Sequence, residues 1–157
     1  MTLYAVLLTL HIVSAAVLFG TGLGIAYFMW MAWRAQNVTA LAITLRHVVF
    51  ADCLFTAVAV AVQPATGVAL IAIVGHDPWA PWLLWSYGLY ALAGACWLPV
   101  VAIQMRLARI ARDAAADGSK VLPPVATRLM RHWFWLGWPA FLAVIAIYGL
   151  MVVKSPA

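Results

Sequence analysis

Four long apolar runs, separated by short polar segments, dominate the sequence. They cover residues 3–33, 43–74, 79–112 and 127–153. A helix that crosses the hydrocarbon core of a bilayer needs about 20 apolar residues, and each run provides them. The runs lack the alternation of a strand, and only helices and closed barrels satisfy their backbone hydrogen bonds in lipid. We therefore expect an all-α protein, a transmembrane four-helix bundle that forms a single domain over residues 1–157.

The composition supports a membrane location. Hydrophobic residues make up 68% of the 157 residues and charged residues only 8%. Soluble domains contain roughly 45–50% apolar and about 25% charged residues, so this chain lacks the polar surface that a water-soluble globule needs. These values exclude a soluble enzyme, a disordered tail and a nucleic-acid-binding module. The expected partner is the lipid bilayer, with a homo-oligomer or other membrane subunits left open.

The basic residues predict an orientation. Eight of the nine Lys and Arg residues lie in or beside the first and third connections, and only Lys154 flanks the opposite side. The positive-inside rule places such connections in the cytoplasm. We therefore expect both termini outside (N-out/C-out), in a bacterial inner (cytoplasmic) membrane. The eight residues are Arg34, Arg46, Arg106, Arg109, Arg112, Lys120, Arg128 and Arg131.

The second run carries a polar stripe. Asp52, Thr56, Ala59, Gln63 and Thr66 follow a 4-3-4-3 spacing, which places them on one face of a helix. This face must look into the bundle, because lipid would leave its polar groups without partners.

An ionisable residue inside a membrane is a functional candidate, so Asp52 has two interpretations. It is either a structural carboxylate held by Arg131, His132 or Gln104, or a residue that handles protons or binds a ligand. A small proton-coupled transporter that uses Asp52 and Gln63 is one such possibility.

His11 is the second intramembrane candidate, and Gln63 is expected at a comparable depth. A neutral imidazole in a helix bundle can serve as an axial ligand of haem iron, so His11 is the candidate metal ligand and haem b the candidate cofactor. The same side chain could instead hydrogen-bond a quinone or a neighbouring helix. Trp97 and Trp135 complete the predicted cofactor-binding set with His11 and Gln63.

The last two runs predict aromatic inner faces with small gaps, suited either to a flat hydrophobic ligand or to ordinary packing. The predicted face of the third run consists of Ser86, Tyr90, Gly94, Trp97, Val101 and Gln104, and that of the fourth of Arg128, His132, Trp135, Pro139, Leu142, Ala146 and Gly149. Prolines at 64, 99 and 139 should kink three helices, which could open a cavity. In the first run, Ala16, Gly20 and Gly24 predict close packing inside the bundle.

No motif identifies an enzyme, and enzymatic activity stays open. The sequence contains no P-loop, nucleophile elbow, metalloprotease helix or paired glutamates. Besides the transporter, two further hypotheses about function therefore remain. One is a membrane protein that binds haem or a related flat redox cofactor, and the other is a structural or accessory membrane protein without a cofactor.

Four strings in the sequence carry a family resemblance. They are LHIVSAAVLFGTGLG, FADCLFTAVAVAVQPATGVAL, GACWLPVVAIQMR and WFWLGWPAFLAVIAIYGLMVVK. Together they resemble the bacterial integral membrane family called domain of unknown function 2269, which implies four helices and no assigned activity. More distantly, the first helix is similar to HemJ-type protoporphyrinogen oxidases and CopD-type copper-resistance proteins. That likeness implies haem or porphyrin handling by His11. A Lys that accompanies the histidine in HemJ-type proteins is absent here, where Trp85 or Ser86 stands instead.

Overall fold

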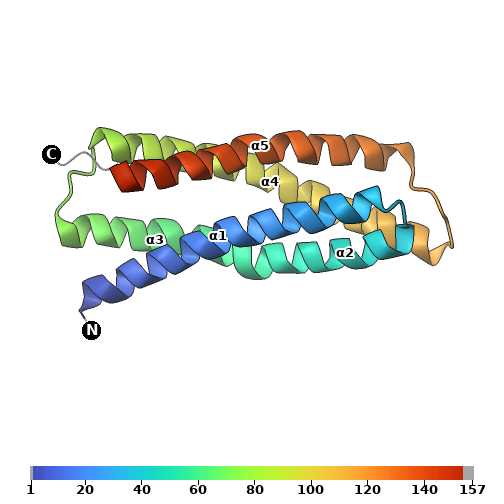
Figure 1. Ribbon diagram of the computed structural model, residues 1–157, viewed down its shortest axis with the longest axis horizontal. Helices are drawn as coiled ribbons and strands as arrows, with labels where there is room; N and C mark the ends of the chain where they lie inside the picture. The colour runs from blue at the N-terminus through green and yellow to red at the C-terminus, as the bar shows by residue number, and fades with distance from the viewer. Residues whose placement is uncertain (1, 154–157) are drawn as a thin grey trace.

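The computed structural model describes residues 2–153, and all its regular structure is helical. The helices are α1 (Leu3–Arg34), α2 (Val38–Ala51), the π-helix η1 (Asp52–Thr56), α3 (Ala57–Val74), α4 (Pro81–Ala116) and α5 (Pro124–Val153). Because α2, η1 and α3 follow one another without a break, the chain forms four long rods (Figure 1).

Local sequence signals set the helix boundaries. The side chain of Thr2 caps α1 by accepting a hydrogen bond from the amide of Ala5, and Asn37 caps α2 in the same way. This cap starts the second rod at Val38, where the sequence pattern placed its start at residue 43. Gly75 ends α3 and Gly118 follows α4, each with a positive φ that an L-residue rarely adopts.

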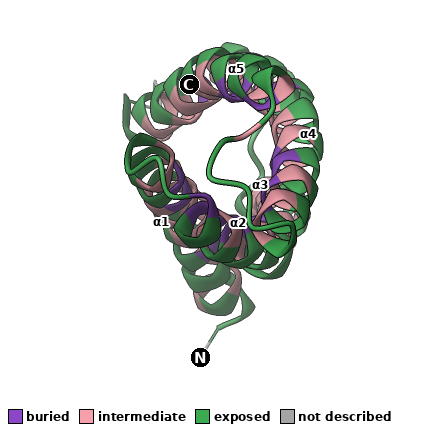
Figure 2. Ribbon diagram, turned by 90° about the vertical axis from the view of Figure 1, so that its right-hand side faces the viewer, coloured by how far each residue is buried: buried purple, intermediate pink, exposed green. Residues whose placement is uncertain are grey.

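Each of the four rods is long and apolar enough to cross a membrane. They are Leu3–Arg34, Val38–Val74, Pro81–Ala116 and Pro124–Val153. Large apolar side chains cover the outside of the bundle, while the buried residues face inward (Figure 2). The prediction of an all-α bundle with four spans is confirmed.

The connections alternate between the two ends of the bundle. Residues 35–37 and 117–123 lie at one end, which also carries the basic residues of the first and third connections. Residues 75–80 lie at the other end, together with the start of α1 and the end of α5 (Figure 1). Lys154, the basic residue expected on that side, lies outside the described residues.

The densest packing lies toward the basic end. A cluster of buried apolar side chains joins α1, α2, α4 and α5 there. The cluster consists of Ile25, Met29, Leu41, Leu45, Val48, Leu107, Ala111, Ala126, Met130 and Trp133. Backbones pack closely between α4 and α5, between α2 and α4, and between α1 and both α2 and α3. The α1–α5 pair meets through side chains instead, which leaves room between these two helices.

The small residues of α1 correct one prediction. Ala16 and Gly20 are exposed, and a Cβ atom added at Gly20 or Gly24 would meet no other atom within 4 Å. This stripe therefore does not mediate close packing inside the bundle. The four-residue spacing places these residues on one face of α1, but the spacing alone does not determine whether that face points into the bundle or toward lipid.

Candidate functional site

The polar stripe of the second rod faces the interior. Asp52, Thr56, Ala59 and Thr66 are buried and Gln63 is half-buried, as the 4-3-4-3 spacing predicts. The sequence pattern did not predict that residues Asp52–Thr56 form a π-helix. Single π-helical turns are rare, and they are frequent at functional sites. The stripe therefore begins at an irregular turn that contains its only carboxylate.

Asp52 is held by a tryptophan of the neighbouring helix. Its Oδ1 accepts a hydrogen bond from the indole Nε1 of Trp97 on α4, at 3.2 Å. Within residues 2–153, the carboxylate forms no hydrogen bond or ion pair with the expected partners Arg131, His132 and Gln104, and the single ion pair joins Arg112 to Asp113. Arg131 and His132 are exposed on α5, and Gln104 is buried in the same cavity wall with its Oε1 unpaired, so none of the three predicted partners holds the carboxylate.

A cavity of about 560 Å³ lies beside this carboxylate, in the middle of the bundle. Asp52 and Thr56 line it from η1, Trp97 and Gln104 from α4, and Gly22 from α1. Side chains of α5 complete the wall. All four rods therefore contribute to one chamber, and the first two residues of the stripe, Asp52 and Thr56, line it.

Aromatic side chains are prominent in the chamber wall. Nine of them line the cavity, and they come from α1, α4 and α5. Tyr90 is fixed in place because its hydroxyl donates to the carbonyl oxygen of Val60, at 2.6 Å. The nine residues are Phe19, Tyr27, Trp30, Tyr90, Trp97, Trp133, Phe134, Trp138 and Phe141.

Three buried oxygen atoms in the chamber wall lack hydrogen-bond partners. They are Oδ2 of Asp52, Oγ1 of Thr56 and Oε1 of Gln104. A buried polar atom without a partner costs free energy, so most such atoms in proteins are paired. The three atoms are themselves covered, but their residues line the chamber, so rotation of these side chains would present the oxygens to a bound molecule.

The chamber opens toward lipid between α1 and α5. Leu23 and Tyr27 of α1 and Trp138 and Ile145 of α5 line the cavity and are also exposed. Next to this opening, rings close the seam: Phe19 packs against Phe141 with ring centroids 5.8 Å apart. Side chains rather than closely packed backbones therefore close this seam.

His11 lies outside the chamber, in a polar cluster between α1 and α3. Its Nδ1 lies 2.8 Å from Oγ1 of Thr66, and its ring packs against Gly67. The amide of Gln63 donates to the carbonyl oxygen of His11 and to the hydroxyl of Ser14. Gln63 therefore lies at the depth of His11, as expected, and the contact between the two residues joins two helices. Neither residue lines the chamber.

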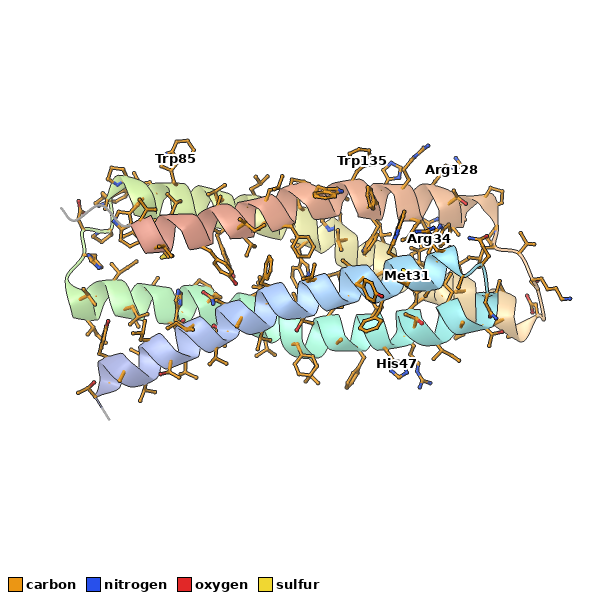
Figure 3. All side chains as sticks on the ribbon, in the orientation of Figure 1. Met31, Arg34, His47, Trp85, Arg128 and Trp135 are labelled. Carbon is orange, nitrogen blue, oxygen red and sulfur yellow. The ribbon has the colours of Figure 1, made fainter. Side chains whose placement is uncertain are left out.

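The inner face of α5 differs from the predicted one. Trp135 is 67% exposed and projects from the outer side of α5, so the expectation that it packs inside the bundle is wrong (Figure 3). His132 is also exposed, and its Nδ1 contacts the carbonyl oxygen of Arg128 one turn earlier. The face that lines the chamber is instead formed by Trp133, Phe134, Gly137, Trp138, Ala140, Phe141, Val144 and Ile145.

The chamber-lining residues of α1 and α5 were missed by sequence reasoning. Around the chamber-lining parts of both helices, residues 18–30 and 133–145, the side chains are apolar on nearly all sides, so no polar face marks the direction of lipid. A weak signal was present on α5, where Gly137 and Ala140 stand beside the bulky rings and leave space between them.

No metal site is visible in the described part of the chain. No three His, Cys, Asp or Glu side chains among residues 2–153 lie together as metal ligands would. Cys53 and Cys96 are both free thiols, the first exposed and the second buried.

The comparisons with known proteins agree with the membrane architecture. No curated protein and no solved structure matches the chain. One family model matches residues 5–155, nearly the whole length, and its description reads predicted integral membrane protein (DUF2269). The chain therefore belongs to this family of multi-pass integral membrane proteins.

Proposed function

We propose that this protein binds a lipid-soluble, ring-containing molecule in the chamber between its helices. The observation that carries the proposal is the cavity of about 560 Å³ with nine aromatic side chains in its wall. Ligand sites are commonly concave and mostly apolar, with volumes of roughly 300–1,000 Å³ and a few polar groups that orient the ligand. Asp52, Thr56 and Gln104 are the polar groups of this chamber.

The position of the chamber suits a ligand that comes from the bilayer. Its opening between α1 and α5 faces the lipid side of the bundle. A hydrophobic molecule dissolved in the membrane would reach the chamber sideways, without crossing water. The aromatic rings would then pack against its flat surface in offset or edge-on geometry.

The chamber fits the ring of a porphyrin better than it fits the iron of a haem. Haem iron in proteins is held mainly by His, Cys, Met or Tyr. The chamber wall contains no His, Cys or Met, the Tyr90 hydroxyl already donates to a carbonyl oxygen, and Tyr27 lies at the exposed opening rather than inside the chamber. His11 would have to leave Thr66 and its place between α1 and α3 to reach the chamber. We therefore propose a ring ligand that is held without coordination by His11.

Filling the chamber tests this proposal. Gly94 lines the cavity, and a Cβ added there would meet no atom within 4 Å, so a Gly94→Phe side chain can occupy the space. Gly20→Phe is the matched control because Gly20 is equally unobstructed and lies on the exposed face of α1. We expect acridine, a neutral three-ring fluorophore, to bind the protein in lipid nanodiscs and to be excluded by Gly94→Phe alone.

Energy transfer from tryptophan to acridine, corrected for empty nanodiscs, measures this binding. Equal binding to both glycine variants would place the acridine in the lipid and overturn the proposal. The protein would then be better described as a structural or accessory membrane component.

We further propose that the basic end of the bundle lies in the cytoplasm and that the protein resides in a bacterial inner membrane. The support is the concentration of basic residues at one end, since the positive-inside rule places such loops on the cytoplasmic side.

A further inference from the structure

We infer that the chamber selects an organic cation, a hydrophobic amine whose charge pairs with the carboxylate of Asp52. This inference rests on the proposed ligand-binding function and names the chemical class of the ligand. The Asp52 carboxylate lines the chamber and is only 3% exposed. One of its oxygens accepts from Trp97 and the other, Oδ2, has no partner.

The described residues supply no positive charge to this carboxylate. No Lys or Arg within residues 2–153 forms an ion pair with Asp52. Arg46, Arg106 and Arg131 are exposed at the basic end. Carboxylates inside membrane proteins are normally paired, and some serve as counter-ions of bound ligands. A ligand that carries a positive charge would complete the pair that the chain leaves open.

The aromatic wall favours the same charge. A cation close to the face of Trp, Tyr or Phe is attracted by the negative potential of the ring, and the attraction grows when water is excluded. Trp97 combines both features, because its indole donates to Asp52 while its ring lines the chamber. A neutral ring would also pack here but would leave Oδ2 unpaired, and an anion would be repelled by an ionised carboxylate.

The orphaned acceptors favour a protonated amine over a quaternary ammonium group. Once the Asp52 carboxylate rotates toward the chamber, an N–H group can donate to its Oδ2, and Thr56, one turn along the helix, carries a second oxygen without a partner. Oε1 of Gln104 is a third acceptor, on a side chain that is only 2% exposed. Gln104 lies seven residues after Trp97 on α4, which is about 10 Å along the helix. An elongated molecule with a second donor would reach both regions.

Three acridines of nearly the same shape separate charge from ring binding. At neutral pH, 9-aminoacridine is a cation, acridine is neutral and acridine-9-carboxylate is an anion. We expect the wild-type protein in nanodiscs of neutral lipid to bind the cation roughly tenfold more tightly than the neutral ring, which corresponds to about 1.4 kcal/mol. The anion should bind most weakly.

Asp52→Asn is the decisive variant because it removes the charge and keeps the shape. It should abolish the cation preference and leave the binding of neutral acridine within about twofold of the wild type. Cys53→Ser, at the neighbouring exposed position, is the control and should keep the preference. Circular dichroism and gel filtration check that the variants are folded.

The outcomes separate the preference for a cation from the binding of the ring. Equal binding of the cation and the neutral ring by the wild type overturns the inference without any variant, and so does a cation preference that persists in Asp52→Asn. In both cases the ring-binding function survives. Failure of all three probes to bind, or binding that Gly94→Phe does not affect, overturns the proposed function and this inference with it.

Discussion

At the scale of single residues, the geometry gives His11 a role in joining two helices. Replacing it with alanine removes the contact with Thr66 and the ring that packs against Gly67. The bond from Gln63 to the carbonyl oxygen of residue 11 would remain, since alanine keeps that carbonyl. We expect His11→Ala to lower the free energy of unfolding by roughly 1 kcal/mol, the scale of hydrogen bonds between membrane helices. Unfolding in mixed micelles, followed by tryptophan fluorescence, measures the change.

Thr66→Val provides the matched comparison for His11→Ala. It removes the hydroxyl that faces Nδ1 and keeps the histidine, so a comparable loss of stability is expected. Absorption spectra of the purified wild type and of His11→Ala, oxidised and reduced, should be the same in the Soret region. A Soret band that disappears in His11→Ala while stability is unchanged would contradict the packing role and favour a haem ligand.

Two residues show how far sequence reasoning extends at this scale. The spacing around Asp52 predicts a buried polar stripe because an unpaired carboxylate cannot face lipid. The same spacing does not identify the partner of Asp52. The structure gives Trp97 as that partner, whereas the predicted partners Arg131 and His132 are exposed on α5. Partners depend on helix rotation, which a sequence without a polar outer face leaves undetermined.

At the scale of helices, the existence of the four spans is predictable and their rotation is not. Apolar length alone predicts each crossing, and caps such as Asn37 refine the boundaries. On α5, apolar residues cover nearly all sides of the part that lines the chamber, so the sequence does not show which face points inward. The pattern therefore predicts Trp135 on the inner face, whereas the structure places it outside. The π-helix over Asp52–Thr56 could not be predicted from the sequence either, because no residue type specifies such a turn.

The aromatic contacts between α1 and α5 should stabilise the bundle. Phe19 contacts both Phe141 and Tyr148, and the Tyr148 hydroxyl donates to the carbonyl oxygen of Ala15 at 2.6 Å. Aromatic pairs of this geometry contribute about 0.5–1.5 kcal/mol beyond the area that they bury. A double-mutant cycle of Phe19→Ala and Phe141→Ala should therefore give a coupling energy near 1 kcal/mol for unfolding in mixed micelles.

The same seam should control access to the chamber. In Tyr148→Phe the ring stays and the hydrogen bond to Ala15 is lost, so the seam opens more easily. We expect faster association and faster dissociation of acridine, with a smaller change in affinity, in stopped-flow energy transfer. Tyr87→Phe, on the exposed surface of α4, is the control and should leave both rates unchanged. Unchanged rates in Tyr148→Phe would indicate that the ligand enters elsewhere.

At the scale of the whole molecule, the fold fixes which connections share a side of the membrane. Residues 35–37 and 117–123 lie at one end and residues 75–80 at the other (Figure 1). The helix α4 has 36 residues and is about 54 Å long, which exceeds the roughly 30 Å of a hydrocarbon core. Its last turns, with Arg106, Arg109 and Arg112, therefore extend beyond the hydrocarbon region at the basic end.

Cysteine labelling separates the fold from the orientation. In a background with Cys53 and Cys96 replaced by serine, single cysteines are introduced as Gln36→Cys, Asp77→Cys and Ser119→Cys. The fold requires that 36 and 119 behave alike and that 77 behaves oppositely toward a membrane-impermeant maleimide. The positive-inside rule then sets the direction, because eight basic residues flank the two connections that share an end. We expect intact cells, with the outer membrane permeabilised, to label position 77 alone, and lysed cells to label all three. The reverse pattern would overturn the orientation and leave the bundle intact, whereas opposite behaviour of 36 and 119 would contradict the four-span arrangement itself.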